Sequence, residues 1–221
     1  IIHWGLILGP IRIPHPEIDG SEFELLRLIS NVSPFEQFFN AFVNIDVENI
    51  DGGMEMLMDA VMLSLRNLSP LQVDLNNRRW LPGTGSDPLK DNFIINWRQN
   101  TDRVIIVFSD EDEQSYMNPE FHRNDVAAAL DAAPNTKLYS FALAFYGWDE
   151  LAINSGGAHF NLTSNSEEMY NNLMTILDDI CAPNRQEQGA FMSFPLNGIE
   201  LYLPASYLSL IHISEPTRRR C

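Results

Sequence analysis

A run of oxygen-bearing side chains follows one of the most apolar stretches of the chain. The stretch is Arg103–Ser109, with the sequence RVIIVFS, and residues 109–115 that overlap and follow it read SDEDEQS. Hard divalent cations bind carboxylate, amide and hydroxyl oxygens of this kind. A solvated acidic turn has the same composition, so residue types alone leave both interpretations open.

The stretch before the acidic run is typical of a central parallel strand, because it is continuously apolar and bounded by charge. In open α/β sheets, ligands bind beyond the carboxyl ends of the strands. We therefore expect the acidic run to lie at the binding edge of such a sheet.

Predicted strands and helices alternate along the rest of the chain. Apolar patterns predict further strands at residues 2–8, 25–29, 137–144 and 158–162, and helices at residues 54–65, 124–133, 148–154 and 166–181. Another helix is expected to begin with Ser33 as N-cap and Pro34 at its first position. The alternation predicts an α/β fold with a mostly parallel sheet.

The end of the chain has a different character. Leu208–Arg218 reads LSLIHISEPTR, which resembles the translation of a sequencing adapter, so residues 208–221 are set aside as non-native. We expect that both ends of the chain are truncations. For residues 184–207, the sequence predicts a linker followed by the start of a second domain of β type. The polar residues 72–92 predict an insertion or a loop that contacts a partner.

Composition excludes several classes of function. The formal charge of −16 disfavours nucleic acid and anionic membranes as partners, and it favours cations or basic partners. No apolar run is long enough to span a membrane. With Cys221 set aside, Cys181 has no partner, so no intrachain disulfide is expected. The five histidines show no metal-ligand spacing.

Several segments in this order resemble a von Willebrand factor A-type domain over residues 1–183. They are HWGLIL, the helix that starts GGME and has Ala60 five residues after Glu55, VIIVFSDE, KLYSFALA, and the ending WDELAINSGGAHFNLTSNSEEMYNNLMTILDDIC. The resemblance implies a doubly wound, Rossmann-like sheet with helices on both faces. It also implies a metal-ion-dependent adhesion site on the top edge.

In that family Mg²⁺ (or Mn²⁺ or Ca²⁺) is held by an Asp-x-Ser-x-Ser loop, a Thr and an Asp, and a carboxylate of the partner completes the coordination. The resemblance assigns the Asp position to Asp110 and the Thr position to Glu55, which is a departure from the family. Glu55 is equally well explained as a helix N-terminal residue that the helix dipole favours. Ser109, Glu111 and Asp112 would lie around the direct ligands.

The Asp-x-Ser-x-Ser string is absent from the chain. The strand that carries it would precede Ile1 and lie between residues 2–8 and 103–109 in the sheet. We therefore expect residues 1–183 alone not to fold stably, since two central strands would lack their shared neighbour.

The resemblance implies a binding module rather than an enzyme. Its partner would be a protein or extracellular ligand that contributes a carboxylate, and its setting would be the cell surface or another extracytoplasmic site, as in exported bacterial members. Two alternatives stay open: an intracellular subunit of an ATP-driven chelatase-type complex, and a metal-dependent Rossmann-like hydrolase using Asp110. For the hydrolase, the sequence offers no recognisable nucleophile, since Ser109 and Ser115 lack a G-x-S-x-G context.

Overall fold

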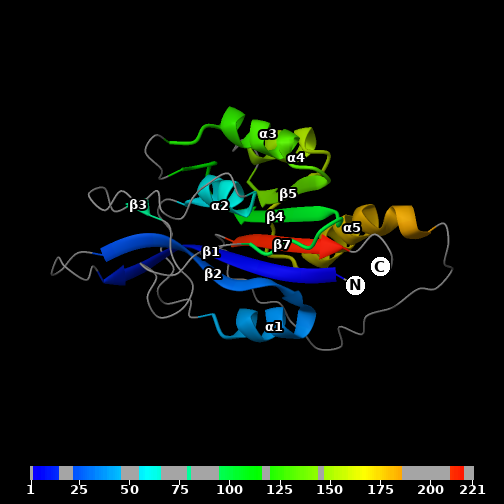
Figure 1. Ribbon diagram of the computed structural model, residues 1–221, viewed down its shortest axis with the longest axis horizontal. Helices are drawn as coiled ribbons and strands as arrows, with labels where there is room; N and C mark the ends of the chain where they lie inside the picture. Colours follow the sequence, from blue (N-terminus) through cyan, green and yellow to red (C-terminus); the bar gives the residue numbers. More distant parts are fainter. Residues whose placement is uncertain are drawn as a thin grey trace.

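The computed structural model describes residues 2–14, 22–45, 55–65, 79–80, 95–115, 120–143, 147–185 and 210–216. In this part of the chain, the strands form one sheet in the order β3-β2-β1-β7-β4-β5-β6 (Figure 1). The strands are β1 (Ile2–Pro14), β2 (Glu22–Pro34), β3 (Arg79–Trp80), β4 (Arg103–Ser109), β5 (Thr136–Ala142), β6 (His159–Asn161) and β7 (Leu210–Pro216). The helices are α1 (Phe35–Val43), α2 (Leu57–Ser64), α3 (Arg123–Ala132), α4 (Trp148–Asn154) and α5 (Ser166–Arg185).

The fold is mixed α/β, as the alternation of elements predicts, but its sheet is less parallel than expected. Strands β4, β5 and β6 are parallel to one another. In contrast, β1 runs antiparallel to β2, and β7 runs antiparallel to both β1 and β4. The expectation of a mostly parallel sheet therefore holds for β4–β6 and for the short pair of β2 with β3, but not for the pairs that β1 and β7 make.

Helices cover both faces of this parallel part, because successive residues of β4 point to opposite faces. Ile105 and Val107 belong to a core cluster that includes side chains of α2, α3 and α4. Val104, Ile106 and Phe108 belong to a second cluster, which contains Met169, Ile176 and Ile180 of α5. The continuous apolar sequence of β4 follows from this burial on both faces.

Helix α1 lies by β2, at the opposite end of the molecule from α3 and α4 (Figure 1). Its buried Phe38 packs near Trp4 of β1, with ring centroids 6.0 Å apart. The predicted N-cap is wrong: the helix begins at Phe35, and Pro34 occupies the cap position without a side-chain cap. The hydroxyl of Ser33 instead donates to the carbonyl of Trp4 at 3.4 Å, since Ser33 belongs to β2.

The segment that was set aside as adapter-like contributes a strand. Strand β7 lies between β1 and β4, which is the place where the sequence predicts a missing strand. Residues 191–203, in which a second β domain is expected to start, lie outside the described residues, as does most of the polar segment 72–92.

Cys181, near the end of α5, is disulfide-bonded. The expectation of no disulfide is therefore wrong for this chain, because it rested on leaving Cys221, the only other cysteine of the sequence, out of consideration. A search of the described residues for a helix with the length and apolarity needed to cross a bilayer finds none.

Candidate functional site

The acidic run begins where β4 ends, at the edge of the sheet formed by the carboxyl ends of β4 and β5. We call residues 110–113 the acidic edge. Asp112 is exposed, and Asp110 and Glu111 are half-buried. The four carboxylates of this turn therefore follow the apolar interior of the sheet directly, with only Ser109 between them and the last apolar residue of β4.

Ser109 joins the acidic edge to the segment before α2. Its side chain is fully buried, and its Oγ lies 2.6 Å from Oε2 of Glu55 and 2.9 Å from the carbonyl oxygen of Glu111. The same hydroxyl accepts a hydrogen bond from the backbone N–H of Glu111 at 3.0 Å. A hydroxyl with these partners fixes both the turn and the Glu55 carboxylate, because a buried polar group held by hydrogen bonds is costly to displace.

Gln114 fastens the other side of the acidic edge to α2. Its side-chain oxygen accepts a hydrogen bond from the backbone N–H of Glu55 at 2.9 Å. Its carbonyl oxygen accepts one from the backbone N–H of Met58 at 3.1 Å. Met58 lies in the first turn of α2, where backbone donors lack intrahelical partners, and Glu55 lies just before the helix. Gln114, the residue after the acidic edge, thus accepts from a donor in the first turn of α2 and ties the acidic edge to this helix.

A second buried carboxylate, Asp59, lies on α2 itself. Asp59 is fully buried, and the hydroxyl of Ser115 donates to its Oδ1. The Ser115 hydroxyl also accepts from the backbone N–H of Phe121 at 3.0 Å. This pair was not predicted from the sequence. The available signal was a charged residue in the middle of an apolar helical stripe, four residues after Glu55.

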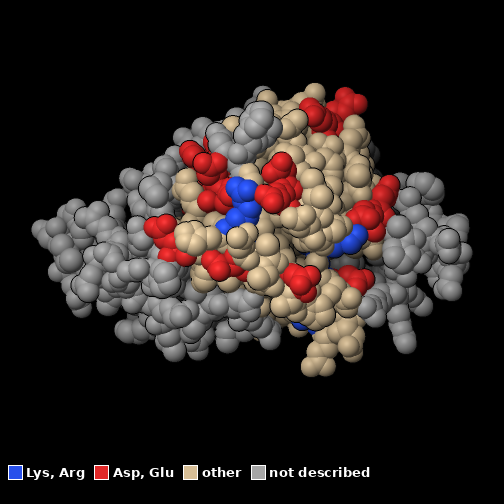
Figure 2. Space-filling model, turned by 90° about the horizontal axis from the view of Figure 1, so that it is seen from above, with Lys and Arg blue, Asp and Glu red and all other residues tan. Residues whose placement is uncertain are grey.

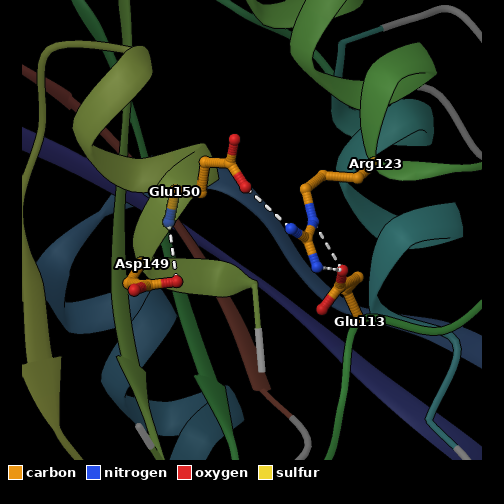
Figure 3. Close-up of polar contacts among 4 residues, drawn as sticks. All are labelled: Glu113, Arg123, Asp149 and Glu150. Atoms are coloured by element: carbon orange, nitrogen blue, oxygen red, sulfur yellow. Dashed lines mark hydrogen bonds and ion pairs between the residues drawn. The ribbon is translucent and has the colours of Figure 1, made fainter. Parts of the chain in front are cut away.

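Arg123 bridges two carboxylates on the outer side of the acidic edge. Figure 3 shows its guanidinium between Glu113 and Glu150. Nε lies 2.6 Å from Oε1 of Glu113, and Nη1 lies 2.7 Å from Oε2 of Glu150. Hydrogen bonding to Glu113, followed by that to Glu150, raises the pKa of Arg123. The Arg123 side chain is 41 % exposed, so these ion pairs orient the edge more than they stabilise the fold.

A shallow depression of about 480 Å³ opens next to this ion-pair group. The residues that line it are Arg123, Gly147, Asp149, Glu150, Ile153 and Asn154. Figure 2 shows the molecule from the side of α3 and α4, where acidic side chains outnumber basic ones. The only basic side chain of the depression is already paired with two carboxylates, so the depression suits a positively charged group better than an anion.

The structure brings two of the predicted metal ligands to the same region but does not complete a metal site. Glu55 is 2 % exposed and accepts the Ser109 hydrogen bond, while Asp110 is half-buried in the following turn. Within the described ranges, no group of three or more His, Cys, Asp or Glu residues is arranged to hold a metal ion. The described residues therefore do not fit a divalent cation by themselves.

A serine and a histidine lie close together elsewhere, between β5 and β6. The Oγ of Ser140 is 2.9 Å from Nδ1 of His159, and it also donates to the carbonyl of Trp148 at 3.2 Å. Burial lowers the pKa of His159, against the opposing effect of the negative charge of Asp149. Because Ser140 is fully buried, its hydroxyl cannot reach a substrate. The pair is therefore a structural contact between neighbouring strands.

Comparison of the chain with protein-family models, with curated proteins and with solved structures finds no significant match.

Proposed function

We propose that the chain is a protein-binding module of the α/β class and that the acidic edge is its binding surface. The observation that carries this proposal is the set of hydrogen bonds that Ser109 and Gln114 make to the start of α2. They tie a turn of four carboxylates, which follows the end of β4, to the segment around the start of α2. A preorganised charged surface loses little conformational entropy on binding, which favours recognition. The net charge of −16 adds long-range attraction for a positively charged partner.

The finer parts of the proposal rest on the sequence. The order of motifs supports a von Willebrand A-type, Rossmann-like domain, and the helices on both faces of β4 and β5 agree with such a domain. The similarity of the acidic turn 109–115 to that of exported bacterial members supports an extracytoplasmic setting. In this proposal the chain binds and does not catalyse.

The experiment measures binding of a fluorescent lysine-rich decapeptide, used as a generic basic partner, to the full chain. An edge variant combines Asp110→Asn, Glu111→Gln and Asp112→Asn. Loss of three ion pairs with the peptide, at about 0.5 kcal/mol each, corresponds to roughly tenfold weaker binding by this variant.

A control variant removes the same amount of charge elsewhere, through Glu36→Gln, Asp131→Asn and Glu167→Gln, all at exposed positions. Its affinity for the peptide is expected to change less than about twofold, since screening limits the reach of distant charges. Equal losses in the two variants would show that only net charge matters, and the acidic edge would no longer be the binding surface.

A second form of the same function uses a divalent cation shared between Asp110 and a carboxylate of the partner. The Ser109–Glu55 hydrogen bond favours this form, because it places Glu55 beside the strand end that Asp110 follows. The remaining ligands would have to come from outside the described residues or from the partner. The cation form predicts saturable Mn²⁺ binding by calorimetry that Asp110→Asn abolishes. If the native chain shows no saturable Mn²⁺ binding, the cation form is excluded, and direct binding of a basic partner surface remains as the proposed function.

A further inference from the structure

A groove runs between helices α3 and α4, beside the acidic edge. Its first part is the depression of about 480 Å³ next to the ion pairs of Arg123. A second depression, of about 320 Å³, is lined by side chains of both helices and by Ser155. Asn154 lines both depressions, so they adjoin, and we call them together the α3–α4 groove. Figure 1 shows the two helices next to each other, at the end of the molecule away from α1.

The first part of the groove is acidic. Arg123, Asp149 and Glu150 line it, and Glu113 is hydrogen-bonded to Arg123. One positive charge against three negative charges leaves a net charge of −2 at this end. Glu150 accepts from Arg123 through Oε2 and its side chain is 57 % exposed, so its carboxylate can also accept from a partner. This end of the groove therefore attracts a basic side chain.

The second part of the groove is apolar. Leu130 and Leu151 are buried in it, and Ala127 and Ala128 leave room along its rim, because an alanine side chain is a single methyl group. Ile153, which lines the first part, is 62 % exposed, the highest value among the large apolar side chains that the structure describes. A partner that covers Ile153 and the alanines would remove apolar surface from water, which stabilises a complex.

The acidic and apolar parts lie about one helical turn apart. Arg123 lines the first part, and Ala127 lines the second part four positions later on α3. At a rise of about 1.5 Å per residue, this separation is about 6 Å along the helix. Side chains four positions apart on a partner helix lie on the same face. One helix can therefore place a basic side chain at the acidic end and an apolar side chain beside the alanines.

We propose that the α3–α4 groove is the docking site for a helix of a partner protein that carries a lysine or arginine and, four positions away, an apolar side chain. The inference rests on the proposed function, because it takes the partner to be basic, and it adds which feature of the partner is recognised. Charge complementarity selects the basic residue, and the apolar part of the groove selects its neighbour. Docking of an amphipathic helix in a groove is a recurring mode of recognition.

The test measures binding of a fluorescein-labelled helical peptide to the full chain by fluorescence anisotropy. The peptide consists of about 16 residues, mostly alanine and glutamine, with one lysine at position i and one leucine at i+4. A matched peptide of the same composition has the leucine at i+2, which lies on a different side of the helix. The native chain is expected to bind the matched peptide at least about fivefold more weakly, because its leucine stays outside the groove.

Variants of the chain locate the binding site. Ala128→Gln fills the apolar part without a change of charge and should weaken binding of the i, i+4 peptide at least about fivefold. Ala132→Gln, at an exposed position of α3 that lines neither depression, is its control and should change the affinity less than about twofold. Glutamine suits a helix, and circular dichroism verifies that both variants keep the native fold.

The acidic end has its own pair of variants. Glu150→Gln should weaken binding of the i, i+4 peptide about threefold, as expected for the loss of one exposed ion pair. Glu167→Gln, at an exposed position of α5, removes the same charge elsewhere and should leave the affinity unchanged within about twofold.

Three results would overturn the inference. They are no measurable binding of the i, i+4 peptide by the native chain, equal affinity for the two helical peptides, and equal effects of Ala128→Gln and Ala132→Gln. The proposed function would survive them if the acidic-edge variant still bound the lysine-rich decapeptide more weakly than the native chain. Failure of the proposed function alone gives a different result. The acidic-edge variant would then bind the decapeptide as the native chain does, while Ala128→Gln would still weaken binding of the helical peptide.

Discussion

A substitution of Ser109 tests the hydrogen bonds that hold the acidic edge, because it leaves the charge of the acidic edge unchanged. Ser109→Ala removes the 2.6 Å hydrogen bond to the buried Glu55 carboxylate. We expect the free energy of unfolding to fall by about 1–3 kcal/mol, because a buried carboxylate loses a donor. Urea titration of the native chain and the variant measures this difference. Ser164→Ala, at an exposed position, is the control and should change stability by less than about 0.5 kcal/mol. Equal effects would contradict the role given to Ser109.

His159 gives a prediction about pH. Burial lowers the pKa of His159 in the folded protein, so the unfolded chain takes up the proton first as the pH falls below about 6.5. The contribution of His159 to stability is complete above this pH and is lost below it, by at most about 1.4 kcal/mol per pH unit. His159→Asn should therefore reduce the difference in unfolding free energy between pH 7.5 and pH 5.5. An unchanged difference in this variant would rule out His159 as its source.

At the residue scale, the sequence predicted the acidic edge but not the contacts that hold it. The position of Asp110 and Glu111 follows from the end of a buried strand, which is a local pattern. Arg123 and Glu150 are 27 positions apart in the chain and are brought together by tertiary packing. A periodic pattern in the sequence does not indicate such a pair. The link between Ser109 and Glu55 was anticipated only in part, through the family resemblance.

At the element scale, the turn between α4 and β6 depends on its second glycine. A Cβ added at Gly157 would lie 2.8 Å from the carbonyl carbon of Leu138 and closer still to its oxygen. Gly157→Ala must therefore displace β5 or the turn, and we expect a loss of about 1–3 kcal/mol or more in unfolding free energy.

The neighbouring glycine is the matched control for this substitution. Gly156 has φ of +82° but open space around it, so Gly156→Ala should cost only the strain of a left-handed residue, about 1 kcal/mol. Thermal and urea unfolding of the two variants give the comparison. A Gly156 variant less stable than the Gly157 variant would contradict the packing described for this turn.

Elements with a strong local pattern were predicted well. The apolar run of β4, the helix α4 before a Gly-Gly turn and the start of α5 lie where the sequence places them. The direction of strands was predicted less well, because a strand has the same alternation whether its neighbour is parallel or antiparallel. Strand β7 was not predicted, because residues 208–221 were set aside for their resemblance to a translated adapter.

At the scale of the whole molecule, the sheet depends on a strand between β1 and β4. A chain that ends at Tyr207 lacks β7, so the edges of β1 and β4 that pair with β7 lose their neighbour. We expect it to show no cooperative unfolding in urea, as the sequence also predicts for residues 1–183. Far-UV circular dichroism of the shortened and full chains provides the measurement. A sharp transition in the shortened chain, at the same midpoint as in the full chain, would contradict this dependence.

The central claim is that the molecule binds through the acidic edge, and residue-resolved NMR tests it most directly. Amide chemical shifts of the ¹⁵N-labelled full chain would be followed during titration with the lysine-rich decapeptide. We expect the largest changes at residues 109–115 and at the start of α2, because hydrogen bonds join these segments. Amide shift changes of similar size at all exposed acidic residues, including those of α5 and α1, would contradict the claim.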